Sequence, residues 1–250
     1  MYFVISDIHG CLNELNKILE HWDRKQETLI VLGDLVDRGY NSLGTIQRLM
    51  ELKKKHKEKV IILRGNHDDN LIKWLHLEPL DKRRYYNKDL HETLRSFYQN
   101  EPAKFRKDTR NQRAIYVKRN FPDVVKFLSE LPYYHETDTC IFVHAGINMN
   151  IWDWKGDKDS MLRIREEFHY NANTSPKRVF FGHTPSKFLH TEENRNGIWV
   201  SKNGDKIGID GGYVFGGQLN GLKVSPIDSA IIEEVNIPNQ QQNLLNVEGT

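Results

Sequence analysis

The apolar residues of the chain gather in five short runs, each followed by glycine or polar residues. The runs span three to five residues and are rich in Val, Ile and Phe, so we interpret each as a buried strand rather than a helix. These predicted strands cover residues 2–6, 29–32, 60–63, 140–143 and 179–181.

Between the first three predicted strands, apolar residues recur at helical spacing. Residues 11–22 place Leu15 and Ile18 on one face, and residues 41–59 repeat the pattern around Ile46. Strands that alternate with helices pair in parallel, so we expect an α/β fold.

The remaining residues divide into a helical insertion, later strands and a tail. The insertion, residues 70–130, predicts helices at 70–76, 90–100 and 122–131, and its only strand-like pattern lies at 114–117. Another helix is expected at 161–168. Short segments separated by Gly and Asn turns predict a second sheet packed on the first, from residues 197–201, 206–210, 222–224 and 229–236. We expect one domain over residues 1–236 and a disordered tail over 237–250.

Composition adds one local feature to this outline. The chain is 38% apolar and 28% charged, with a net charge of +2, as is typical of a globular protein. Residues 73–119, however, hold thirteen Lys and Arg against six Asp and Glu, a balance of +7 that leaves −5 elsewhere. This basic segment also carries many aromatic residues. It could attract anionic substrates, or it could be a solvated helical face.

Other features bound the location and the partners. The first strand starts at residue 2, which leaves no room for a secretory signal, and no apolar run approaches the roughly 18 residues of a membrane span. Cys11 and Cys140 are expected to be small buried thiols. We therefore expect a cytoplasmic protein, without a membrane or specific nucleic-acid partner, and favour a monomer.

Residue types that bind metals follow all five predicted strands. In α/β sheets, ligands collect beyond the carboxyl ends of the strands, because the loops there carry polar groups. Turn chemistry alone does not account for five endings drawn from Asp, His and Asn. The residues are Asp7, His9, Asp34, Asp37, Asn66, His67, His144 and His183.

These segments, in this order, resemble the calcineurin-type metallophosphoesterases, and specifically their phosphoprotein phosphatase branch. The resemblance implies two mixed sheets packed as a sandwich and flanked by helices. It rests on residues 7–9, 33–39, 64–68, 144–146 and 182–184. Residues 208–219 resemble the ending of bacterial members, but Gly211 replaces a hydroxyl residue, and we assign Asp210 no role.

The donor set contains oxygen and nitrogen atoms only, which suits two divalent ions such as manganese, our first choice, iron or zinc. The resemblance implies that the first ion takes Asp7, His9 and Asp34. It implies that the second takes Asp34, as a bridge, with Asn66, His144 and His183. A water or hydroxide between two cations is a strong nucleophile for direct attack on phosphorus.

The resemblance also assigns the residues that handle the substrate. His67 is expected to protonate the leaving group, with Asp37 orienting its ring. Arg38 and Arg165 are expected to bind phosphate, together with Asn66. Arg163 is the alternative to Arg165, because it stands where relatives have tryptophan. Arg64 is expected to support the site from behind.

Three functions follow from this set. The first is a metal-dependent phosphatase acting on phosphoserine and phosphothreonine in proteins. The alternative is a symmetrical hydrolase of diadenosine tetraphosphate or a related nucleotide anhydride, which an aromatic clamp for adenine, from Trp152, Trp154 or the insertion, would favour. An open, shallow groove would favour a protein substrate. The third is a non-catalytic scaffold, which the complete set of ligands argues against.

Overall fold

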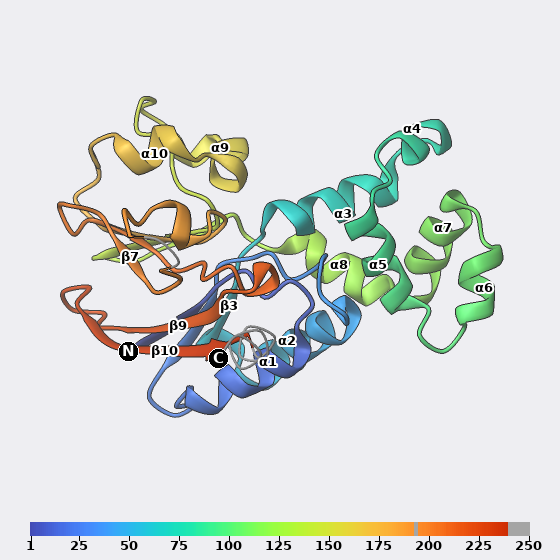
Figure 1. Ribbon diagram of the computed structural model, residues 1–250, viewed down its shortest axis with the longest axis horizontal. Helices are drawn as coiled ribbons and strands as arrows, with labels where there is room; N and C mark the ends of the chain where they lie inside the picture. The colour runs from blue at the N-terminus through green and yellow to red at the C-terminus, as the bar shows by residue number, and fades with distance from the viewer. Residues whose placement is uncertain (193–194, 240–250) are drawn as a thin grey trace, which may run out of the picture.

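Two five-stranded mixed sheets form the centre of the protein in a computed structural model that describes residues 1–192 and 195–239 (Figure 1). The first sheet has the order β10-β9-β1-β2-β3 and contains β1 (Tyr2–Ile5), β2 (Thr28–Val31), β3 (Val60–Ile62), β9 (Gln218–Val224) and β10 (Ile231–Pro238). The second has the order β4-β5-β6-β8-β7 and contains β4 (Tyr134–Glu136), β5 (Cys140–Val143), β6 (Arg178–Phe181), β7 (Trp199–Val200) and β8 (Lys206–Gly208). The predicted α/β sandwich is confirmed.

Parallel pairing joins the strands that precede the predicted ligands. β1 pairs with β2, and β2 with β3, with Val4 opposite Ile30. In the second sheet β5 pairs with β6, and β6 with β8. The two sheets bury a common core, in which Val4 and Ile30 meet Phe142 and Phe180. Because both sheets contribute to one core, the ends of their parallel strands meet.

Helices cover the outer faces of the sandwich. α1 (Leu12–Ile18) and α2 (Ser42–His56) pack on the first sheet, and α9 (Lys158–Arg163) and α10 (Glu166–Tyr170) on the second (Figure 1). Residues 66–130 form a helical region beside the sheets, made of α3 (Asn66–His76), α4 (Pro79–Arg84), α5 (Lys88–Phe97), α6 (Pro102–Lys107), α7 (Arg110–Asn120) and α8 (Pro122–Glu130). Within the described residues, no helix is long and apolar enough to cross a membrane.

The structure corrects two predicted elements. Residues 114–117 lie in helix α7, not in a strand, because the Thr109 hydroxyl and the Gln112 side chain cap the helix start and Ala114 and Val117 face the core. The expected helix at 161–168 breaks at Arg165, whose backbone is not helical (φ −133°, ψ −101°).

The later strands are also distributed differently from the prediction. β9 and β10 do not join the second sheet. Instead β9 pairs antiparallel with β1, which would otherwise be an edge of the first sheet. β10 continues through Ile237 and Pro238, two residues that the sequence assigned to the tail. The rest of that predicted tail, from residue 240, lies outside the described residues.

Candidate metal centre

Every predicted metal ligand lies just beyond the end of a parallel strand. Asp7 and His9 follow β1, Asp34 follows β2, and Asn66 follows β3 in the first sheet. His144 follows β5 and His183 follows β6 in the second sheet. Hydrogen bonds join these loops: the His183 N–H donates to both Asp7 carboxylate oxygens (3.0 and 3.2 Å), and the His9 N–H donates to the Asp34 carbonyl oxygen (2.9 Å). The two sheets therefore supply one site.

The loops hold an uncommon backbone conformation. Eight non-glycine residues in the described part of the chain have positive φ, and six of them are predicted site residues: Asp7, His9, Asp34, Asp37, Arg38 and His183. A left-handed conformation is unfavourable for residues with a Cβ, and it persists where surrounding contacts enforce it. Because six of the eight lie at one site, the contacts around that site must hold these side chains in their observed directions.

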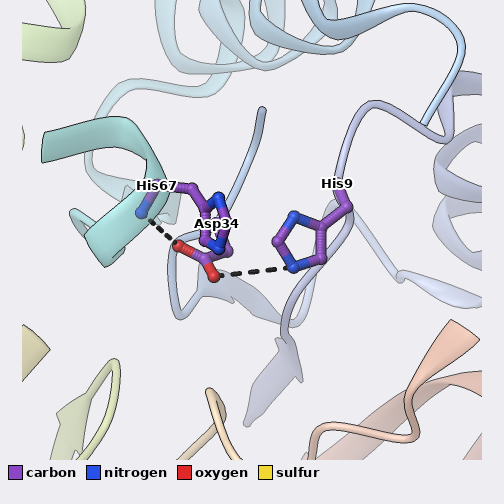
Figure 2. Close-up of side chains that lie close together, drawn as sticks. All are labelled: His9, Asp34 and His67. Atoms are coloured by element: carbon purple, nitrogen blue, oxygen red, sulfur yellow. Dashed lines mark hydrogen bonds and ion pairs between the residues drawn. The ribbon is translucent and has the colours of Figure 1, made fainter. Parts of the chain in front are cut away.

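The Asp34 carboxylate lies at the centre of the cluster. Its Oδ2 is 3.5 Å from Nε2 of His9, and its Oδ1 is 3.5 Å from Nε2 of His144. The backbone N–H of His67 donates to Oδ1 (2.9 Å), which fixes the carboxylate from the side of α3 (Figure 2). Asp34 is common to the two possible metal-binding groups, one with His9 and His67 and the other with His144 and His183.

Gly65 allows this carboxylate to lie where it does. A Cβ placed on Gly65 would overlap both the backbone nitrogen and the Oδ1 of Asp34. The loop after β3 therefore packs directly against the residue between the two groups, and only glycine fits there.

The imidazoles of His9 and His144 direct their Nε2 lone pairs towards the cluster. Nδ1 of His9 donates to the Val36 carbonyl (2.8 Å), and Nδ1 of His144 donates to the Leu32 carbonyl (2.9 Å). These bonds turn both Nε2 atoms inward, as in metal-binding histidines. Burial is the main cause that lowers the pKa of His9 to about 4 and of His183 to about 2. Both rings are therefore neutral near pH 7 and can act as ligands.

Several acceptor atoms converge on the cluster. Nε2 of His144, an acceptor when Nδ1 is the donor, lies 2.9 Å from Oδ1 of Asn66. Burial opposes ionisation of Asp34, but the neighbouring histidines outweigh it and lower its pKa, whereas burial raises the pKa of Asp7. Divalent cations fit such a set, because they supply the charge that these oxygen and nitrogen atoms attract.

His67 and Asp37 form a pair at the edge of the cluster. Nδ1 of His67 donates to Oδ2 of Asp37 (2.7 Å). Burial disfavours the protonated ring, but Asp34 and Asp37 raise the pKa of His67 above its usual value. The pair thus fixes the His67 ring, whose Nε2 lies 2.9 Å from Nη2 of Arg38.

A residue of the helical region holds this pair in place, and sequence reasoning missed it. The Thr93 hydroxyl, on α5, donates to Oδ1 of Asp37 (2.6 Å) and accepts the Asp37 N–H (2.9 Å). Thr93 is fully buried. No sequence signal identified it, because it is 56 residues away from Asp37 and belongs to no motif.

The arginines lie on different sides of the site. Arg38 donates from Nη1 to Nε2 of His9 (2.7 Å), and its Nη2 lies 2.9 Å from Nε2 of His67. Arg165 donates to the hydroxyl of Thr184, the residue after His183 (2.8 Å). Arg163 instead forms ion pairs with Asp69 and Asp159.

These contacts distinguish Arg165 from Arg163. Arg165 forms no ion pair within the described residues, whereas Arg163 is paired with Asp69 and Asp159. α10, which begins directly after Arg165, is anchored at its other end by the buried Lys206, whose ammonium donates to the carbonyls of Phe168, His169 and Asn171. Arg64 donates to the carbonyls of Leu128 and Ser129, and so connects α8 to the loop after β3.

Two buried acids border the site without a predicted role in it. The Asp68 carboxylate accepts the N–H groups of Gly65 and Leu35, and burial raises its pKa to about 8. Asp210 accepts the Gly212 N–H, and burial together with the nearby Asp7 charge raises its pKa well above the usual range. Asp210 therefore lies close enough to Asp7 for the two charges to repel each other.

Two donor groups that share one buried carboxylate, set where two packed sheets meet, define a dinuclear metal-dependent hydrolase. The family model described as "Calcineurin-like phosphoesterase" matches residues 2–217. The chain belongs to this family, which uses a dinuclear metal centre.

Individual relatives include hydrolases of two substrate classes. The bis(5'-nucleosyl)-tetraphosphatase PrpE (asymmetrical) of a Bacillus cereus strain is 28% identical, over 92% of this chain and 93% of the relative. The PP2A-like serine/threonine-protein phosphatase PPG1 of Candida albicans is 41% identical, but only over 28% of this chain and 17% of the relative.

Solved structures share the fold. A candidate diadenosine tetraphosphatase aligns with a TM-score of 0.59 at 22% identity, covering 95% of this chain and 92% of its own. A serine/threonine phosphatase of Saccharomyces cerevisiae aligns with a TM-score of 0.59 at 14% identity, covering 95% and 79%.

The contact between Gly65 and Asp34 predicts a specific loss of metal. In Gly65→Ala the added Cβ would displace the shared carboxylate, so we expect manganese content to fall from two ions per chain to less than one. Elemental analysis after incubation with manganese and gel filtration measures this. Gly197→Ala is the matched control, since a Cβ there meets nothing within 4 Å. Two tightly bound ions in Gly65→Ala would show that Asp34 does not have to stay in this position.

Proposed function

We propose that this chain is a metal-dependent phosphohydrolase that attacks phosphorus directly, with dinucleoside polyphosphates as its first candidate substrates. The observation that carries the chemistry is the position of Asp34, whose two oxygens face two separate groups of donors. A single-ion site would not need a carboxylate directed to both sides. The substrate class is supported by the relatives that match over nearly the whole chain.

Two divalent ions, with manganese the first choice and iron or zinc next, would supply an activated water and neutralise charge on the phosphate. The first would be held by Asp7, His9 and Asp34. The ligands proposed for the second are Asp34, Asn66, His144 and His183.

Arg38 and Arg165 are proposed to bind the phosphate oxygens from two sides, with Asn66 between them. Nε2 of His9, which now accepts a hydrogen bond from Arg38, is also the atom that would bind the first ion. Ion binding there would release one guanidinium N–H for the substrate. Arg165 offers a second planar guanidinium, from the side of the second sheet, for two N–H bonds to phosphate oxygens.

His67 is proposed to deliver a proton to the leaving group. Asp34 and Asp37 raise the pKa of the ring, which favours its protonated form, and Asp37 fixes its orientation. The bond from Thr93 prevents Asp37 from rotating away. Protonation matters most when the leaving group is a poor one such as an alkoxide, and less for a phosphate.

Phosphoserine and phosphothreonine in proteins are the second candidate substrates. The basic segment 73–119 and the local similarity to a serine/threonine phosphatase favour them. The sequence alone ranked them first, and we place them second here because the relatives that match over nearly the whole chain are named as nucleotide hydrolases. The sequence also suggested symmetrical cleavage, whereas those relatives are named as asymmetrical. The scaffold is not proposed, and the cytoplasmic location and the monomeric state stay predictions.

Substrate preference is the first measurement. Chelator-stripped protein reloaded with manganese, iron, zinc or magnesium should hydrolyse diadenosine tetraphosphate with a higher kcat/KM than a phosphothreonine peptide. Chromatography of the nucleotide products gives the cleavage position. A peptide preference would restore the phosphoprotein assignment. Absence of hydrolysis with every metal would refute the enzymatic proposal.

Two substitutions separate metal binding from proton delivery. Asp34→Asn should lower the affinity for both ions at least tenfold, because it removes the shared charge. His67→Asn should keep two ions per chain and lower kcat for an alkyl phosphate by about 10²–10⁴-fold. Titration calorimetry and steady-state kinetics give the two readouts. Unimpaired turnover in either variant would contradict the role assigned to that residue.

Thr93→Val tests whether the Thr93 hydrogen bonds to Asp37 help to orient His67. The isosteric change removes both hydrogen bonds to Asp37, so we expect kcat for an alkyl phosphate to fall about tenfold, more than kcat for p-nitrophenyl phosphate, whose leaving group needs less protonation. Metal content should not change. Thr93→Ser, which keeps the hydroxyl, is the control. Equal losses on both esters would mean that Thr93 only stabilises the fold.

A further inference from the structure

A cavity of about 390 Å³ opens directly from the proposed leaving-group side of the site. Asp37 and His67 form one end of it, and the helical region forms the rest through Trp74, Leu77, Tyr85 and Leu90. Because His67 is the proposed proton donor, a group in this cavity would belong to the departing half of the substrate. The cavity lies in the size range of small-ligand sites.

The apolar lining of the cavity includes two aromatic rings, the fixed indole of Trp74 and the exposed ring of Tyr85. Trp74 is 2% exposed, and its indole N–H donates to the Lys82 carbonyl (3.0 Å), so that side chain cannot easily turn. The Lys82 ammonium in turn donates to the Leu77 carbonyl, which connects α4 to the end of α3. Tyr85 is 56% exposed and offers a face on which a planar group can stack. The helices thus form a rigid apolar recess with one accessible aromatic face.

The polar groups of the cavity include two amide donors. Oδ1 of Asn70 accepts a hydrogen bond from Arg163 (2.8 Å), and Oδ1 of Asn87 accepts the Leu90 N–H (2.8 Å). Both amide NH₂ groups are without an acceptor among residues 1–192 and 195–239. They suit a ligand whose edge carries acceptor atoms, such as the ring nitrogens of a purine.

Two cations lie at the cavity. Lys73 is part of its lining, where its ammonium pairs with Asp69 (2.7 Å), and the guanidinium of Arg84 lies 5.5 Å from the centre of the Tyr85 ring. The helical region around it carries the +7 balance of residues 73–119. This charge matches a polyphosphate that extends from the metal centre towards the recess.

We infer that this cavity binds the base of the leaving nucleotide of a nucleoside polyphosphate whose scissile phosphorus lies at the metal centre. This inference rests on the proposed function and specifies its substrate. A flat ring with acceptor atoms and a polyanionic chain matches the stacking face, the amide donors and the cations together. An apolar side chain of a peptide would use the recess but neither the amides nor the charge.

The test uses the exposed ring, whose loss should not disturb the fold. In the full-length, manganese-loaded protein, Tyr85→Ala should lower kcat/KM for diadenosine tetraphosphate about tenfold more than for tripolyphosphate, which has the same anhydride but no base. Equilibrium dialysis with radiolabelled AMP should show a similar loss of affinity. Tyr85→Phe should restore both. Tyr170→Ala removes another exposed tyrosine, on α10 and outside the cavity lining, and serves as the control.

A second variant tests the cavity without relying on Tyr85. Leu77→Trp should fill the recess and produce the same selective loss on the dinucleotide. Equal losses on both substrates, or unchanged AMP binding in both variants, would overturn the inference. A loss confined to a phosphothreonine peptide would assign the cavity to a peptide side chain and also overturn it. If the wild-type protein hydrolyses neither anhydride but binds AMP through Tyr85, base binding in the cavity is supported and the proposed hydrolase activity is refuted.

Discussion

The structure depends on one buried carboxylate, that of Asp34, which pairs with no Lys or Arg among the described residues. Its two oxygens face Nε2 atoms of His9 and His144, and burial keeps His9 neutral. A buried anion is costly unless positive charge or hydrogen bonds compensate it. The His67 N–H and the close contact with Gly65 hold the group in place but do not neutralise it. The strained loops around it are therefore best explained as a preformed receptor for cations.

Much of this arrangement was predictable, because the ligand residues directly follow strands that the sequence pattern identifies. The five buried strands were identified from short apolar runs, and each ligand stands within a few residues of a strand end. Parallel pairing then places these ends together, whatever the loops between them do. Asp34 and His144 are far apart in the sequence, yet the pattern was sufficient to expect them in one site. The matching family model supports the same fold independently.

The rest could not be predicted, since it depends on contacts between distant segments. Residues 114–117 have strand-like composition, but capping at Thr109 and burial of Val117 select a helix. The break at Arg165, which divides one expected helix into two, has no signal in the local pattern. β9 covers the open edge of β1 only because the chain returns there after the second sheet. Thr93 likewise acquires its partner Asp37 only when α5 packs beside α2 and its N-terminal loop.

Helix α5 joins the chemistry to the choice of substrate. Thr93 on this helix holds Asp37, while Leu90, one turn earlier, lines the cavity beyond His67. A displacement of α5 would therefore alter the orientation of the proton donor and the shape of the recess together. The metal ligands come from the strand ends of the sandwich and do not depend on α5. The proposed division of labour follows from this: the two sheets activate the phosphate, and the helical region determines which leaving group is protonated.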